Sequence, residues 1–346
     1  MITLLDIQSR NPGHLDQRIY DRLRLTAPEI DRAPARVIQG TTYKFMHRDT
    51  APKLGFRPAN TGVQIADSQK VAMELRECFI LQTLIGVDKA MAEGYPGGWQ
   101  SLLTDEVIAH MKGFKLSMAL QFWYGHRVDE LGFPGIFQQM GDHMTLHADA
   151  SKNEDNATNR KDNSGTSAVF LVENPEFFEM VFGMNRGIHF DAVRDADLPR
   201  MDKNGLAGML PCKVQDGTSW VGLAGKDPLM AARLKCIKDY GVEAGDPSVI
   251  TDDKLAELLS FFPAGVKPTA LYMTMRCGRI LQKSRSKALT FNQGDTVEVT
   301  APWPTKFGDI PIVYTDALLD DESDASLAAV KGISQFASPR IATLQK

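Results

Sequence analysis

The chain has 346 residues, of which 43% are hydrophobic, 24% charged and 8% aromatic, a composition typical of a globular protein that buries a core. The formal net charge is −4, which does not indicate a basic nucleic-acid-binding module. Residues 1–60 carry ten Lys or Arg and six Asp or Glu, whereas the remainder carries 29 and 37. We therefore expect a mildly cationic N-terminal arm attached to an anionic body.

The sequence predicts neither a membrane span nor a secretory signal. The longest apolar run, residues 78–87, is interrupted by Gln82 and Thr83 and is far shorter than the roughly 20 residues that cross a bilayer. The N-terminus lacks the cationic start and the apolar stretch of a signal peptide. We expect a cytosolic protein with four reduced, buried thiols rather than disulfides or a zinc site, because no C-x-x-C pair occurs among Cys78, Cys212, Cys236 and Cys277.

The N-terminal part is predicted to extend away from a core. Residues 1–36 are polar, rich in arginine and interrupted by three prolines, which suits an arm with at most one short helix at 15–25. Residues 37–63 combine β-branched and aromatic residues with a turn-rich tip and predict a long β-hairpin. Because a two-stranded hairpin alone is at best marginally stable, we expect it to lie on another surface.

The next segment predicts a strand and two helices. One strand with a single wet face is expected over residues 70–85, and a short helix ended by glycine over 88–94. The strongest helical signal spans 104–124, where Thr104 is a candidate N-cap and apolar residues recur at intervals of three or four from Leu103 to Phe122. This pattern predicts a long amphipathic helix with one packed stripe and a polar back.

The second half is predicted to be rich in strands. Residues 149–167 contain no apolar side chain larger than alanine and predict an exposed loop. An amphipathic helix is expected at 252–262, and a loosely held tail after Asp320. Strands are expected at 168–172, 179–183, 219–224, 270–275, 279–281, 296–300 and 310–315.

Two histidines raise the question of a metal site. His143 and His147 are four residues apart, so a helix would place both imidazoles on one face, and Asp142 or Asp149 would complete the ligand set. The glutamate that follows the first histidine of a zincin motif is missing here, which favours a solvated surface over a metal-dependent hydrolase. The sequence also lacks a G-x-S-x-G elbow, a Walker A motif and a G-x-G-x-x-G motif after any predicted strand.

The arm and the hairpin cannot bury their apolar residues within their own chain. We therefore expect both to become stable on other subunits, and heterologous contacts of this kind generate rings and shells. The arm is also able to touch phosphates non-specifically, although interleaved aspartates are equally compatible with salt bridges to a neighbouring chain. The arginines concerned are Arg10, Arg18, Arg22, Arg24, Arg32 and Arg36.

Residues 38–63 resemble the extended-loop segment of major capsid proteins from tailed double-stranded DNA phages, which have the Hong Kong 97-type fold. The segment is most similar to the subgroup of short-tailed phages such as epsilon fifteen. The similarity is collinear over about residues 3–322. Further stretches that follow in the family's order are 121–125, 133–136, 166–172, 220–224, 271–273 and 308–319.

The resemblance implies an α+β capsid fold with a defined order of parts. These are an N-terminal arm (1–36), an extended β-hairpin loop (37–68), a peripheral domain with a long spine helix (69–125), an axial domain (126–265), closing strands that return to the peripheral domain (266–322) and a C-terminal tail (323–346). Loops of the axial domain would meet at the five-fold and six-fold axes. We identify no lysine and asparagine pair for covalent cross-linking.

The resemblance also implies a non-enzymatic shell subunit without a metal or cofactor. Such a subunit self-assembles as hexamers and pentamers into an icosahedral head around double-stranded DNA, is made in the cytoplasm of a bacterial host and ends in the virion. Its partners would be further copies of itself, a portal, and scaffold and decoration (cement) proteins, with no membrane. An encapsulin-like compartment, a metal hydrolase using His143 and His147, and a phage decoration or scaffold protein are the alternatives.

Specific residues are expected to make the contacts between subunits. Tyr43, Phe45 and Phe56 would be apolar anchors, and Arg48 and Arg57 would pair with charges on the neighbour. The alternative for each aromatic residue is packing within its own chain. The arm would face the interior or the DNA through Arg10, Arg18, Arg22 and Arg24.

Overall fold

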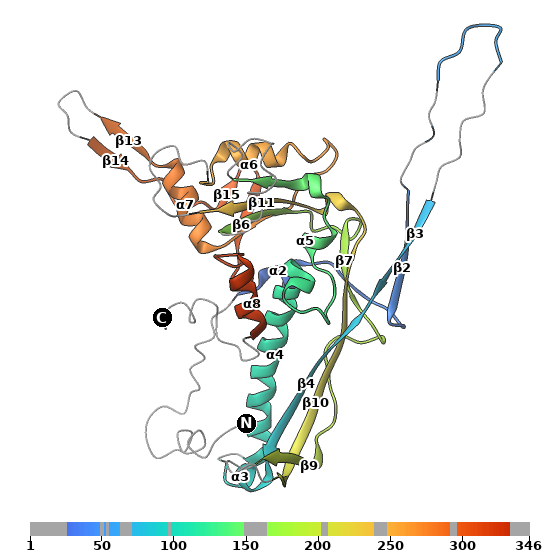
Figure 1. The fold of residues 1–346 in the computed structure, drawn as a ribbon, viewed down its shortest axis with the longest axis vertical. Helices are drawn as coiled ribbons and strands as arrows, with labels where there is room; N and C mark the ends of the chain where they lie inside the picture. Colours follow the sequence, from blue (N-terminus) through green and yellow to red (C-terminus); the bar gives the residue numbers. More distant parts are fainter. Residues whose placement is uncertain are drawn as a thin grey trace.

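The computed structural model describes residues 26–48, 52, 55–62, 71–95, 98–148, 165–201, 207–238, 248–290 and 296–332. These residues form an α+β body of two six-stranded sheets and one long helix, from which two two-stranded hairpins project (Figure 1). No helix in these ranges is both long and apolar enough to cross a membrane. The four cysteines are free and buried, as predicted.

The long helix α4 (Gly98–Tyr124) has 27 residues and is therefore about 40 Å long. It begins six residues before the predicted start, so Thr104 is not a cap but an internal residue whose hydroxyl donates to the Gln100 carbonyl at 2.8 Å. The helix ends because Gly125 adopts φ +56° and a Cβ there would lie 2.2 Å from the Gly135 nitrogen. Only glycine fits this left-handed position.

The packed stripe of α4 is only partly as predicted. Leu103, Phe114, Met118 and Phe122 are buried, but Met111 is 41% exposed. The C-terminal end of the helix is buried on several faces, since the neighbouring side chains Trp123 and Tyr124 are fully buried as well. A single stripe with a polar back therefore describes only part of the helix. The short helix α3 (Lys89–Glu93) confirms its prediction and is capped by the Asp88 carboxylate.

The first sheet lies along α4 and is built around one long strand. Strand β10 (Ala207–Gly225) pairs with β4 (Phe79–Asp88) on one side and with β7 (Phe178–Phe182) on the other, and β7 pairs in parallel with β1 (Ala35–Val37). The strands β8 (His189–Phe190) and β9 (Arg194–Met201) also pair with β10. The Thr83 hydroxyl contacts the His110 ring of α4 at 2.8 Å, which places α4 on one face of the sheet.

The second sheet holds the main hydrophobic core. Its strand order is β15 (Lys306–Phe307), β16 (Ile310–Tyr314), β12 (Ala270–Met273), β6 (Thr166–Leu171), β11 (Ala231–Ile237) and β5 (Thr145–His147). All residues of β6 and β12 are buried. The helices α6 (Asp252–Leu259) and α7 (Met275–Arg285) lie against this sheet, and the short helices α2 (Pro28–Arg32) and α5 (Ile136–Gln139) adjoin α4.

Two hairpins leave the body on opposite sides (Figure 1). One pairs β2 (Thr42–Arg48) with β3 (Val71–Glu77), and the other pairs β13 (Lys287–Thr290) with β14 (Thr296–Val299). The return strand of the first hairpin was predicted before residue 63 but lies at 71–77. The single strand predicted over 70–85 is two strands, β3 and β4, which belong to different sheets and meet at Cys78.

Other predictions differ at particular places. Residues 279–281, predicted as a strand, lie inside α7, whose start is capped by the Thr274 hydroxyl accepting from the Cys277 N–H. The region after Asp320 is not a loose tail throughout, because Glu322 is buried and α8 (Asp324–Gly332) follows. Of the predicted polar loop, residues 149–164 lie outside the described residues, and its last residues are buried in β6.

The expected division into a peripheral and an axial domain stays a prediction. The sheets combine strands from several of the expected parts. Strands β7 and β10, which come from the segment 126–265, pair with β1 and β4. Strands β12 and β16, which come from the expected closing segment 266–322, join the sheet that contains β6 and β11. These sheets are formed by parallel and antiparallel pairing between strands that are far apart in the sequence. Local sequence patterns do not reveal such pairing.

Candidate functional site

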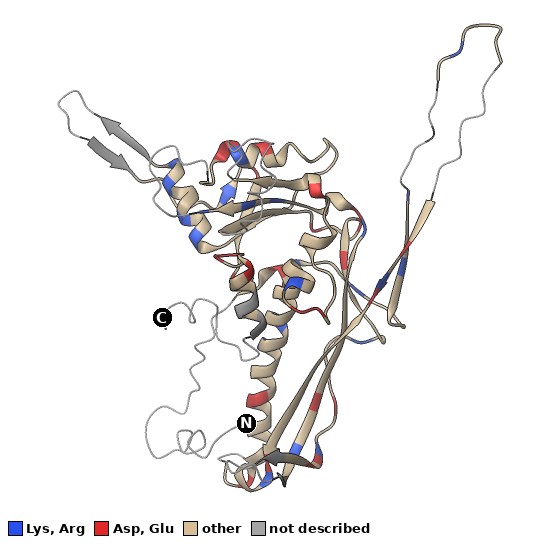
Figure 2. Ribbon diagram, in the orientation of Figure 1, with Lys and Arg blue, Asp and Glu red and all other residues tan. Residues whose placement is uncertain are grey.

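The hairpin of β2 and β3 has two faces of different character. Its register places Tyr43 opposite Arg76, and Met46 opposite Met73. Because neighbouring residues of a strand point to opposite faces, the odd-numbered residues of β2 share one face and the even-numbered ones share the other. We call the face with the odd-numbered residues of β2 the inner face. The opposite face carries a set of apolar residues that we call the outer strip. Figure 2 shows basic residues on both strands of this hairpin.

The inner face packs against its own chain. Tyr43 and Phe45 stack with ring centroids 5.8 Å apart, and both pack on a small cluster that contains buried Cys78 and Val181. The Arg76 guanidinium lies 6.0 Å from the Phe45 ring centroid, within the range of a cation–π contact. These two predicted anchors therefore make the intrachain contacts that were the stated alternative.

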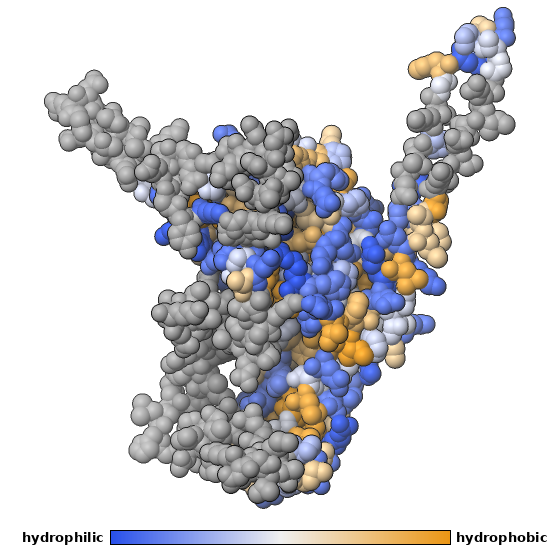
Figure 3. All heavy atoms as spheres, viewed as in Figure 1, coloured by the Kyte–Doolittle hydropathy of each residue, from blue (hydrophilic) through white to orange (hydrophobic). Residues whose placement is uncertain are grey.

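The outer strip has no partner in the described part of the chain and is apolar. It consists of Val71, Met73 and Leu75 on β3 and Met46 on β2, which are 52%, 62%, 46% and 74% exposed. Exposed Lys44 and Arg48 flank Met46 on β2. On β3, Glu74 and Arg76 are only partly exposed, whereas Val71, Met73 and Leu75 are exposed, as is Glu77 at the end of the strand. This inverts the wet face predicted from the sequence. Figure 3 shows apolar side chains gathered on the hairpin above its junction with the body.

The base of the hairpin is joined closely to the first sheet. The Cys78 N–H donates to the Thr41 carbonyl at 2.8 Å, and the Met184 N–H donates to the Gly40 carbonyl at 3.1 Å. Strand β10 passes so near that a Cβ on Gly222 would lie 2.7 Å from the Glu77 carbonyl oxygen. A glycine is needed at this crossing because a side chain would push the hairpin away.

A buried carboxylate gathers charged groups at this base. Glu179 of β7 is 3% exposed and accepts two hydrogen bonds from Arg36 at 2.8 and 2.9 Å. Lys226 pairs with the same carboxylate at 2.8 Å, and the Tyr43 hydroxyl donates to it at 3.4 Å. Burial disfavours the charged form, but the hydrogen bonds from Arg36 and Lys226 outweigh burial and lower the pKa of Glu179.

The other predicted contact residues lie on the hairpin and beyond its described strands. Arg48 ends β2 and is exposed. Phe56 is fully exposed, and Arg57 donates to the Thr61 carbonyl. The described residues 55–62 lie at the outer end of the hairpin, far from the body (Figure 1). The structure therefore leaves Arg48 and Phe56 free of packing within the described chain, in contrast to Tyr43 and Phe45.

Only part of the arginine-rich arm is described. Arg10, Arg18, Arg22 and Arg24 lie outside the described residues, as does the predicted helix at 15–25. Arg32 and Arg36 pair within the chain, with Glu173 and Glu179.

The described arm is also held by a buried carboxylate. Glu29 of α2 accepts from the Trp123 indole N–H at 3.3 Å and from the Thr315 hydroxyl at 2.8 Å. Burial raises the pKa of Glu29 to about 7.

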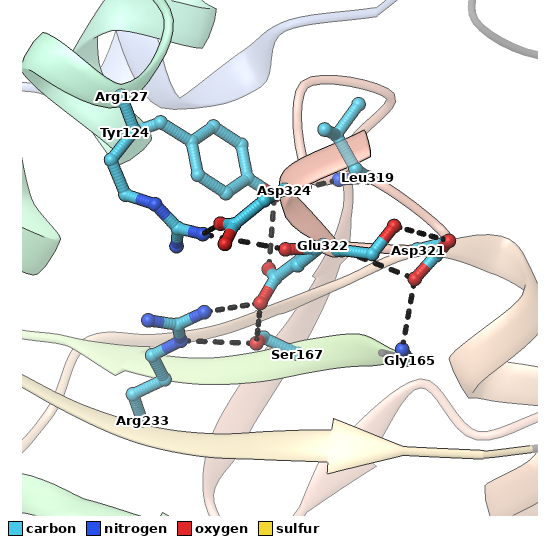
Figure 4. A network of polar contacts seen from close by, with 10 residues as sticks. Tyr124, Arg127, Gly165, Ser167, Arg233, Leu319, Asp321, Glu322 and Asp324 are labelled. Atoms are coloured by element: carbon cyan, nitrogen blue, oxygen red, sulfur yellow. Dashed lines mark hydrogen bonds and ion pairs between the residues drawn. The ribbon is translucent and has the colours of Figure 1, made fainter. Parts of the chain in front are cut away.

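A second polar network fastens the C-terminal segment (Figure 4). Glu322 is 1% exposed and accepts hydrogen bonds from Tyr124 at 2.9 Å, from Ser167 at 2.7 Å and from Arg233. Burial, followed by the nearby Glu322 charge, raises the pKa of Tyr124 and keeps its hydroxyl a neutral donor. The network joins α4, β6, β11 and the segment before α8, and Arg127 adds an exposed pair with Asp324 at 2.8 Å.

The predicted metal pair is not on one helix. His143 lies in a 3₁₀ turn (Asp142–Met144), and His147 ends strand β5, so the four-residue spacing does not place the imidazoles on a common helical face. Within the described residues no group of three or more His, Cys, Asp or Glu side chains is placed to hold a metal ion. The helical argument for a metal-dependent hydrolase is therefore wrong.

Comparison with known proteins identifies the family. No curated protein matches the chain, but the family model described as major capsid protein GP7 matches residues 18–326. The chain belongs to this family. As a major capsid protein it is a structural component of the virion, and its resemblance to phage capsid proteins is confirmed.

Solved structures agree with the capsid family. The capsid protein of bacteriophage Epsilon15 is 17% identical, with a TM-score of 0.63, and the alignment covers 94% of this chain and 97% of that chain. This similarity shows the predicted Hong Kong 97-type fold. The capsid of bacteriophage JBD30 is 9% identical, with a TM-score of 0.48 and coverage of 91% and 98%. An encapsulin from Synechococcus elongatus is 9% identical, with a TM-score of 0.40 and coverage of 68% and 96%.

Sequence reasoning missed the most informative residues of this capsid protein. Met73 carried a usable signal, since Val71, Met73 and Leu75 alternate with Glu74 and Arg76, but the exposed side was assigned the wrong way round. Met46, between Phe45 and His47, carried no comparable signal. Glu179 and Glu322 carried no local signal, because their partners come from distant segments.

Proposed function

We propose that this capsid protein self-assembles as hexamers and pentamers into an icosahedral head that encloses double-stranded DNA. The outer strip of the β2–β3 hairpin carries this proposal. Its four apolar residues are solvent-exposed in the single chain, while Glu74 and Arg76 of β3 are turned toward the inner face. Such contiguous exposed apolar surface marks a site of association.

The strip would dock on a second copy of the chain. Apolar area removed from water gives about 25 cal/mol per Å², and the basic residues Lys44 and Arg48 would pair with acidic groups of the neighbour. Arg48, Phe56 and Arg57 stay candidates for contact with a neighbour. Tyr43 and Phe45 would act indirectly, by holding the hairpin that presents these residues. A contact between unlike surfaces closes rings and shells.

Other partners follow from the family. A portal, and scaffold and decoration proteins, would join the shell, and the arm would face the packaged DNA through Arg10, Arg18, Arg22 and Arg24 without base specificity. Assembly would take place in the host bacterial cytoplasm. The proposed role requires no enzymatic activity or cofactor.

Electron microscopy of the purified full chain tests this function, with nucleic-acid and protein content measured on the same particles. We expect closed particles built from rings of six and five subunits. Expression beside the other head proteins should yield particles containing DNA. Particles that enclose a protein cargo and never DNA would favour an encapsulin-like compartment, and a chain that stays monomeric in all conditions would contradict the proposal.

A further inference from the structure

The direction of the β2–β3 hairpin depends on the contacts at its base, because a small tilt there displaces the residues farther along the hairpin by a larger distance. At about 3.3 Å per residue, the five steps from Tyr43 to Arg48 span about 16 Å. A tilt of about 10° at Tyr43 would then move Arg48 by about 3 Å. Apolar contact requires heavy atoms within about 4.5 Å, so such a tilt would weaken docking most at the far end of the outer strip, where Val71 lies opposite Arg48.

Backbone hydrogen bonds fix the position at which the hairpin leaves the sheet. Side-chain contacts at the base hold the orientation of its inner face. Tyr43, at the second position of β2, lies near two cations: the Arg36 guanidinium is 5.7 Å and the Lys226 ammonium 5.6 Å from its ring centroid. Both distances are within the range of cation–π attraction. Because the two cations repel each other, an anion that both contact stabilises their proximity.

Glu179 supplies that anion. Its carboxylate accepts hydrogen bonds from Arg36 through both oxygens and pairs with Lys226 through one of them. It also lies 3.4 Å from the Tyr43 hydroxyl. The four residues come from β1, β7, the segment after β10, and β2, so one buried charge joins the hairpin to three parts of the first sheet. Lys226 is further fixed by donating to the Pro175 carbonyl at 2.7 Å.

We propose that Glu179, Arg36, Lys226 and Tyr43 form a clamp that sets the direction of the β2–β3 hairpin, with Glu179 as the positioning residue. The Tyr43 ring carries the constraint outward, because it stacks on Phe45 and Phe45 in turn lies 6.3 Å from the His47 ring. The clamp is a property of the single chain. Its importance for subunit docking rests on the proposed function.

The clamp is tested on the unassembled full chain by measuring a distance between two spin labels. One label is placed at Arg48→Cys on the hairpin and the other at Ala109→Cys on the exposed side of α4. The native thiols are buried and are checked for labelling in the chain without the new cysteines. We expect one narrow distance distribution in the otherwise native chain and a distribution at least twofold wider, or shifted by about 3 Å or more, in Glu179→Gln.

Two further variants make the result decisive. Glu176→Gln removes a negative charge from an exposed residue of the same region and should leave the distribution unchanged. Lys226→Met keeps the carboxylate paired with Arg36 and should give an intermediate width, and it decides the test if Glu179→Gln does not fold. A distribution of native width in the folded variants would overturn the clamp.

Particle yield separates the clamp from the proposed function. If the hairpin is misdirected in Glu179→Gln and the yield of closed particles falls at least tenfold, both inferences are supported. If the hairpin is misdirected but particles form at native yield, the clamp stands and docking through the outer strip is contradicted. Glu176→Gln should assemble like the native chain.

Discussion

Replacing both methionines of the outer strip should weaken assembly without weakening the subunit. Met46 and Met73 face each other across the hairpin and are 74% and 62% exposed in the single chain. Their replacement by serine therefore removes little packing, and we expect the free energy of unfolding of the subunit to change by less than about 0.5 kcal/mol.

The cost should appear when subunits dock. Full burial of a methionine side chain gives about 1.5–3 kcal/mol, and these two are already partly covered, so each would lose about 1–2 kcal/mol in docking. The sum of about 2–4 kcal/mol corresponds to a docking constant about 30- to 700-fold weaker, since every 1.4 kcal/mol is tenfold.

Light scattering at increasing protein concentration measures this effect as the critical concentration for particle formation. We expect it to rise at least tenfold in the Met46→Ser, Met73→Ser variant. Met209→Ser is the matched control, because Met209 is 71% exposed but lies on β10, away from the hairpin. Equal critical concentrations for the native chain, the control and the double variant would refute the reasoning.

Three further outcomes concern the subunit itself. Glu322→Gln should lower the free energy of unfolding by about 3 kcal/mol in denaturant titration, because it leaves the buried Arg233 without its anion. Asp324→Asn removes a charge from an exposed pair and should change the free energy of unfolding by no more than about 1 kcal/mol. The pKa of Glu29 is about 7 in the folded chain against 4.5 ordinarily, so the folded chain holds more protons between these values and stability should fall as pH rises from about 4.5 to 7, by about 3 kcal/mol in total. Glu29→Gln should flatten that part of the stability profile, and an unchanged slope would contradict the assignment. All four cysteines are buried, so a thiol reagent should modify none in the native chain within the time that it modifies four after unfolding, and rapid native labelling would count against the structure.

The fold was predictable where local pattern and tertiary structure agree. The helix α4 and strands such as β6 and β16 were predictable from apolar patterns, and the short helix α3 from its terminating glycine, because these signals depend on neighbours in sequence. The strand predicted at 279–281 failed because the Thr274 cap starts a helix a few residues earlier. A three-residue segment with two apolar side chains does not distinguish a strand from a helix.

The site was less predictable because a strand pattern shows alternation but not which side is covered. In β3 the pattern of Val71, Met73 and Leu75 against Glu74 and Arg76 was recognised, and the usual rule placed the apolar side inward. The single chain shows the opposite, which is the arrangement expected when the covering surface belongs to another molecule. The aromatic residues Tyr43 and Phe45 appeared the better anchors by type, yet their parity directs them to their own sheet.

A reconstruction of assembled particles by electron cryo-microscopy, at a resolution that separates side chains, tests the central claim most directly. The account predicts that Met46 and Met73 of each subunit lie within contact distance of a neighbouring copy, while Tyr43 stays beside Arg36 and Lys226 of its own chain. Particles in which both methionines face solvent, or are covered by their own subunit, would contradict it.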